Sequence, residues 1–163
     1  MSSTTRRAPH RHTPDLQMLP AATHSYLSRS AASLREAVIA PDVPTRYACA
    51  HVAALQAAAA LLAARAHPTP ARRRQKNAWI LLAEVAPEFI EWATFFAAGA
   101  GKRAAAEAGL SRSVSEREAD DLVRDADRFL AVVESSLGLV PHVSEASQRG
   151  SAQAGWAERN GVA

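Results

Sequence analysis

The stretch "TRYACAHVAALQAAAALLAAR", residues 45–65, decides the fold class because it predicts one long helix. Alanine has the highest helix propensity of all residues, and Pro44 suits the first turn of a helix. At 100° per residue, Ala50, Ala53, Ala57 and Ala64 share one face with Arg46. Because side chains this small let a second helix come close, we expect the protein to form a homodimer through this face.

Three further helical segments surround this helix in the sequence. The first is predicted over residues 22–40, and a second begins near residue 77, where Pro87 must kink it or split it. The last has the clearest start, a capping box of Ser115 and Glu118, and Gly138 marks its end. No segment shows the alternation of a strand. We therefore predict an all-α bundle of four or five helices over residues 23–137, with a disordered tail over 1–22 and a flexible tail over 138–163.

Composition places the chain among soluble globular proteins, with 48% hydrophobic and 21% charged residues. Residues 23–137 carry 14 Lys or Arg against 13 Asp or Glu, so a site for a polyanion must be local. The single cysteine, Cys49, excludes an internal disulfide and suits a reducing cytoplasm. The stretch 47–64 has few charges, but alanine is near neutral for insertion, so we expect no membrane span and a cytoplasmic location.

Arg46 and His51 are the first candidate functional residues, since an arginine and a histidine can serve phosphate chemistry together. On one helix they lie roughly 140° apart around the axis and about 7.5 Å apart along it. Across a symmetric pair of helices, the two copies of each could meet in a shared cleft. Two other interpretations stay open: a surface ion pair for Arg46, for example with Asp42, and a hydrogen-bonded core position for His51.

A second candidate site is a basic stretch between the second and third helices. Such a run of cations could bind RNA phosphates with salt-dependent affinity, or could be an ordinary solvated loop. The residues are Arg65, Arg72, Arg73, Arg74 and Lys76. The last helix interleaves acids with Arg117, Arg124 and Arg128, which predicts a solvated face with ion pairs between successive turns.

No metal or cofactor is expected. Glu84, Glu88 and Glu91 lie at helical spacing, but no Glu-x-x-His follows them, so a di-iron site is not predicted. The stretch "AAGAGK" lacks the preceding strand and the following Ser or Thr of a phosphate-binding loop.

Four stretches together resemble one known family: "YLSRSAASLREAV", "RYACAHVAALQAAAALLAARAHP", "AWILLAEVAPEFIEWATFFAAGAGKRAAAEAG" and "EREADDLVRDADRFLAVVE". The sequence is similar to HEPN domains (higher eukaryotes and prokaryotes nucleotide-binding), of the small alanine-rich branch from high-GC bacteria. The resemblance implies a helical bundle that commonly dimerises. Many members are metal-independent RNases with an arginine and a histidine four to six residues apart. Others lack this motif and bind RNA or pair with minimal nucleotidyltransferases, as in toxin–antitoxin systems.

Carried onto this sequence, the resemblance makes Arg46 the motif arginine and His51 the motif histidine. It implies that His51 takes a proton from an RNA 2′-hydroxyl while Arg46 holds the phosphate. The sequence thus predicts a HEPN-type protein that binds RNA or nucleotide, with or without metal-independent endoribonuclease activity. The alternative is a non-catalytic helical module that pairs with a partner protein such as a minimal nucleotidyltransferase. A helix-turn-helix DNA binder is disfavoured, because no short Gly-containing turn joins two helices of which one is basic.

Overall fold

The computed structural model describes residues 18–65, 77–110 and 112–143, and the predicted RNA-binding residues Arg72, Arg73, Arg74 and Lys76 lie outside this part. The described residues form helices and the turns that connect them, with no strand. Its elements, in chain order, are α1 (Ala21–Ile39), α2 (Val43–Arg65), α3 (Ala78–Val85), the 3-10 turn η2 (Pro87–Phe89), α4 (Ile90–Ala98), α5 (Ala100–Glu107) and α6 (Glu116–Ser136). The predicted all-α bundle is confirmed.

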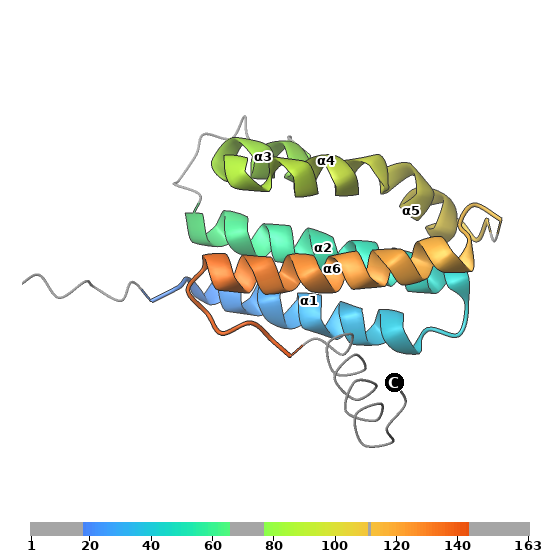
Figure 1. Cartoon of the computed structure of the whole chain (residues 1–163), viewed down its shortest axis with the longest axis horizontal. Helices are drawn as coiled ribbons and strands as arrows, with labels where there is room; N and C mark the ends of the chain where they lie inside the picture. The colour runs from blue at the N-terminus through green and yellow to red at the C-terminus, as the bar shows by residue number, and fades with distance from the viewer. Residues whose placement is uncertain (1–17, 66–76, 111, 144–163) are drawn as a thin grey trace, which may run out of the picture.

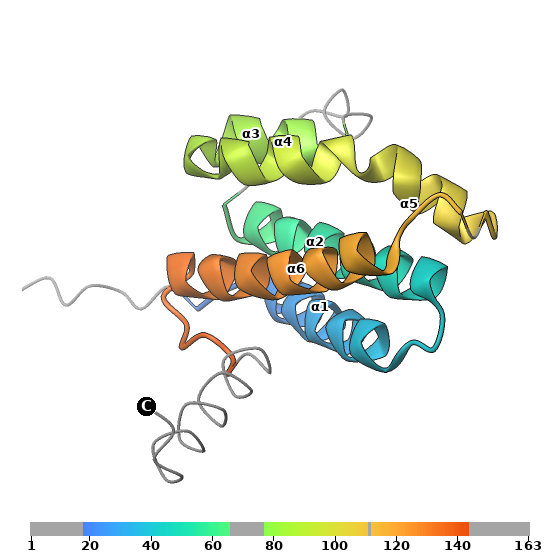
Figure 2. The same ribbon diagram turned by 45° about the vertical axis from the view of Figure 1, so that its right-hand side comes forward.

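The helices pack in two layers around α2. Helices α1, α2 and α6 lie alongside one another, and α3, α4 and α5 cover the side of α2 that faces away from α1 (Figures 1 and 2). Helix α3 lies beside α4, so that Trp79 stacks on Phe96 at a centroid distance of 5.2 Å. Helix α2 contacts α1, α3, α5 and α6, so it is the central helix of the bundle. Its length and mean hydropathy would also allow a membrane span. Half of that span is buried inside the bundle, however, as expected for the core helix of a soluble protein.

Local signals in the sequence set the helix boundaries. The Ser115 side chain accepts a hydrogen bond from the Glu118 backbone N–H, and the Glu118 carboxylate accepts one from the Ser115 N–H, which completes the predicted capping box. Pro87 divides the third segment into α3 and α4, with η2 between them. Gly138 has a φ of 74° directly after α6, a conformation that glycine adopts at low cost.

The alanine face of α2 is already covered within the chain. Ala50, Ala53 and Ala57 are fully buried. Helix α1 packs along α2, and the buried Ser30 hydroxyl donates a hydrogen bond to the Ala53 carbonyl at 2.8 Å. The small side chains do permit close helix packing, but the neighbouring helix belongs to the same chain. The expected dimer interface at this face is therefore wrong, and a homodimer would need another surface.

Enlarging this face should lower the stability of the bundle and leave the oligomeric state unchanged. We expect Ala57→Leu to reduce the free energy of unfolding by roughly 1–3 kcal/mol, because the added atoms meet a fully packed contact. Ala104→Leu on the exposed surface of α5 is the matched control and should stay within about 0.5 kcal/mol of the parent protein. Urea denaturation measures the free energy of unfolding of the two variants. A dimer that dissociates in Ala57→Leu while the fold keeps its stability would contradict this view.

Candidate functional site

Arg46 lies in the first turn of α2, where Asp42 fixes the start of the helix. The Asp42 carboxylate accepts a hydrogen bond from the Thr45 N–H at 2.9 Å, which lowers the pKa of Asp42. The Arg46 guanidinium reaches across to α6, where its Nη1 pairs with Asp120 Oδ1 at 2.6 Å, and the Arg46 side chain is only 19% exposed. This ion pair neutralises the cation that the helix dipole disfavours at this position. Of the alternatives that the sequence left open, the structure shows an ion pair, with Asp120 as the partner.

His51 lies one turn further along α2 and is 1% exposed. Its ring meets Trp79 and Phe96 edge to face, at centroid distances of 5.9 and 6.1 Å. Its Nε2 lies 2.9 Å from the Phe96 carbonyl oxygen. Because a carbonyl can only accept, Nε2 carries the hydrogen and donates it. Burial lowers the pKa of His51, so the ring is neutral near pH 7.

The Phe96 carbonyl is available to His51 because the helix breaks there. Gly99 separates α4 from α5, and its N–H bonds back to Phe96 in a tightened turn. A Cβ atom on Gly99 would lie 2.9 Å from the Tyr47 hydroxyl and 3.5 Å from His51 Nε2. The absence of a side chain at residue 99 therefore lets the α4–α5 segment approach α2 at these two residues.

The structure does not bring Arg46 and His51 together. Arg46 contacts α6 through Asp120, whereas His51 is enclosed by aromatic rings from α3 and α4. The second ring nitrogen of His51, Nδ1, is also buried and has no hydrogen-bond partner among the described residues. Both nitrogens of His51 are thus buried in this arrangement, and Nδ1 is the one whose lone pair is not used.

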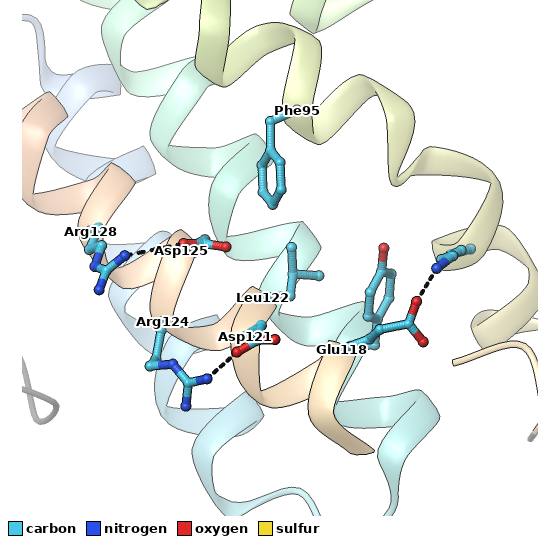
Figure 3. Close-up of a pocket in the computed structure, with 9 residues that line it drawn as sticks. Phe95, Glu118, Asp121, Leu122, Arg124, Asp125 and Arg128 are labelled. Atoms are coloured by element: carbon cyan, nitrogen blue, oxygen red, sulfur yellow. Dashed lines mark hydrogen bonds and ion pairs between the residues drawn. The ribbon is translucent and has the colours of Figure 1, made fainter. Parts of the chain in front are cut away.

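A groove of about 520 Å³ lies beside this region, between the α4–α5 segment and α6. Tyr47 and Leu122 form the apolar part together with Phe95, which points from α4 toward α6 (Figure 3). The rest of the lining is charged: Lys102, Glu118, Asp121, Arg124, Asp125 and Arg128. This volume is in the range of sites that hold small molecules.

Ion pairs balance the charges around the groove. Lys102 pairs with Glu118, Arg124 with Asp121, and Arg128 with Asp125 at 3.6 Å. The Lys102 ammonium, together with the Ser115 groups, lowers the pKa of Glu118 to about 2. Burial raises the pKa of Asp125. The predicted solvated face of α6 is thus one wall of a groove with equal numbers of cations and anions.

No group of three or more potential metal ligands occurs in the described part of the chain. Glu88 pairs with Arg65 across the gap between η2 and α2, which lowers the pKa of this carboxyl. Cys49 is a free thiol of intermediate exposure, and burial raises its pKa above the ordinary value. Glu88 therefore serves an ion pair with Arg65 in the described part of the chain.

One ionic cluster lies beyond the helix end that the sequence predicts. After Gly138 the chain turns back along α6, and His142 Nδ1 and Nε2 lie 2.8 Å from Glu134 and 2.9 Å from Asp127. The His142 N–H also donates to Glu134. These contacts tie residues 138–143, the start of the predicted flexible tail, to the end of α6. In the sequence, only Pro141-His142 and the two acids of α6 point to these contacts, and such a pattern alone does not predict them.

The fold and the site together define a helical bundle in which the arginine and the histidine of an R-x4-H spacing both make structural contacts. The family model described as SAV_6107-like HEPN matches residues 37–134, more than half of the chain. The protein belongs to this HEPN family. Neither the curated proteins nor the solved structures contain a match to the chain.

Proposed function

We propose that this protein is a non-catalytic HEPN domain that acts by binding RNA or a nucleotide. The observation that carries the proposal is the state of His51, which is buried, neutral and hydrogen-bonded to a backbone carbonyl. Family membership supports a role connected with RNA or nucleotides. The function is thus that of a degenerate relative of the HEPN RNases, in which the motif residues stabilise the bundle.

The cations of residues 72–76 supply the phosphate contacts in this proposal. Arg72, Arg73, Arg74 and Lys76 follow one another without an intervening acid. The groove in the described part of the chain offers no comparable run, since each arginine there is matched by a carboxylate. The protein would act in the cytoplasm, as a homodimer formed through a surface other than the alanine face of α2.

A cleavage assay tests the absence of catalysis. Mixed-sequence RNA is incubated in EDTA with the parent protein, His51→Ala and Arg46→Ala, and the products are analysed for 2′,3′-cyclic phosphate ends. We expect no cleavage by any of the three proteins. Cleavage by the parent protein that falls at least about 10²-fold in both variants would overturn the proposal and make the pair catalytic.

A binding assay tests the cationic segment. Fluorescence anisotropy with a single-stranded RNA should show binding that weakens as salt increases, with a slope of about 0.7 per phosphate contact. Replacing Arg72, Arg73, Arg74 and Lys76 by alanine should weaken binding at least about tenfold at low salt and flatten the slope. The matched control removes four exposed arginines elsewhere, Arg29, Arg35, Arg112 and Arg117, and should bind much as the parent does.

The alternative function is a partner-binding module, for example one that pairs with a minimal nucleotidyltransferase in a toxin–antitoxin system. It is favoured by the groove, whose mixed charges and half-exposed Phe95 also suit a protein surface. Absence of RNA binding by the parent protein at any salt concentration would reject the first proposal in favour of this one.

A further inference from the structure

We propose that the groove between the α4–α5 segment and α6 holds a single unpaired nucleobase, which stacks on Phe95 and hydrogen-bonds to the Tyr47 hydroxyl. The inference rests on the proposed binding function and assigns the base and the phosphates to different parts of the chain. Three independent features of the groove support it: an unpartnered hydroxyl, an exposed aromatic ring and a charge balance that disfavours phosphate.

The Tyr47 hydroxyl faces the groove and has no hydrogen-bond partner among the described residues. The residue is 5% exposed and lines the groove, yet its hydroxyl makes no hydrogen bond within the described segments. The hydroxyl lies near Gly99, at the end of the groove toward α5. The charges of Lys102 and Glu118 both interact with it electrostatically. The ring of Tyr47 is thus buried while its hydroxyl opens into the groove, where its hydrogen is free to be donated to a ligand. Ring nitrogens and carbonyl oxygens of a nucleobase are acceptors that this hydroxyl can serve.

Phe95 offers an aromatic surface to the same groove. Its side chain leaves α4 toward Leu122 (Figure 3), and the residue is 47% exposed, although the neighbouring Phe96 is fully buried. Phe96 meets the Phe95 ring edge to face at 5.0 Å, which limits the ring's freedom. An aromatic ring held in place at a groove wall is the usual platform for an unpaired base.

The balanced charges of the groove favour binding of an uncharged base over binding of a phosphate. Asp121, Asp125 and Glu118 are each paired with a cation, so a phosphate entering the groove would have to compete with three carboxylates. An uncharged base can enter without breaking these pairs. The phosphates on either side would then remain outside the groove, in solvent.

The test uses uncharged nucleosides as probes, so that phosphate contacts play no part. Adenosine, guanosine, cytidine and uridine are titrated into the ¹⁵N-labelled full-length protein and followed by amide chemical shifts. At least one should shift the amides of Phe95, Gly99 and Leu122 at millimolar concentration. Phe95→Ala should weaken this binding about fivefold or more, since a lost base stack costs at least that much. Tyr47→Phe should weaken it by roughly fivefold, since it removes one hydrogen bond to the base. Tyr26→Phe on α1 and the four-residue variant of segment 72–76 are the controls and should bind nucleoside normally.

RNA binding gives a second readout that separates the two proposals. Tyr47→Phe should weaken RNA binding without changing the salt slope, whereas the variant of segment 72–76 should flatten the slope. If no nucleoside shifts the groove amides, or if both groove variants bind like the parent, base binding in the groove is rejected. Salt-dependent RNA binding through segment 72–76 would still stand in that case.

Discussion

Truncation of Phe129 to alanine should destabilise the bundle by about 3–5 kcal/mol, the cost of removing a fully buried aromatic side chain. Phe129 comes from α6 and is completely buried. Its ring lies within 5.2–6.4 Å, centroid to centroid, of four rings from the other layer: Trp79, Phe89, Trp92 and Phe96. This cluster joins α3 and α4 to α6, so its loss should separate the two layers first.

Guanidinium denaturation followed by tryptophan fluorescence measures the effect, because Trp79 and Trp92 both lie in the cluster. Phe95→Ala is the matched control: the same side chain is removed from the adjacent layer, but at a half-exposed position. It should cost less than half as much as Phe129→Ala. Equal losses in the two variants would mean that the cluster does not hold the layers together.

The fold could be predicted from the sequence because its signals are local. The capping box at Ser115, the break at Pro87 and the stop at Gly138 each act through the backbone within one turn. The helical spacing of Leu122, Ala126, Phe129 and Val133 likewise places one face inward whatever lies opposite, and all four are buried. Such patterns do not predict which neighbouring helix covers each buried face.

The alanine face of α2 is an example of a face whose neighbour the sequence does not identify. Its small side chains correctly predict close helix packing, but they are equally compatible with a helix of the same chain and a helix of another copy. Only the tertiary arrangement, with Ser30 of α1 bonded to Ala53, identifies the occupant as α1.

The candidate site depended on contacts distant in sequence, so it could be predicted only in part. The inward position of His51 follows from helical periodicity, and its burial agrees. Its partner is a backbone carbonyl 45 residues away, exposed by the break at Gly99, and Asp120 is 74 residues from Arg46. No spacing rule within one helix predicts either contact. The groove likewise assembles from four separate helices, α2, α4, α5 and α6, so no pattern in the sequence links Tyr47 to Phe95.

The remaining large effect concerns pH and the segment after α6. Both ring nitrogens of His142 contact carboxylates, which requires the doubly protonated ring, and Asp127 and Glu134 raise the pKa of His142 to about 9. In the unfolded chain the pKa returns to about 6.5. Between these two values the folded state binds more protons than the unfolded state, so stability falls as pH rises.

We therefore expect the contribution of His142 to be complete below about pH 6.5 and to disappear as pH rises through about 9. At 1.36 kcal/mol per pKa unit the upper limit is about 3 kcal/mol, and partial exposure of the ring should reduce it to roughly 1–2 kcal/mol. Urea denaturation of the parent protein and His142→Gln at intervals from pH 6 to pH 10 measures the difference directly, since other titrating groups cancel between the two proteins. The difference should be largest at pH 6 and vanish near pH 10, and amide exchange in residues 138–143 should accelerate over the same interval. A difference that stays constant with pH would mean that His142 stabilises the end of the bundle by packing alone, with a neutral ring.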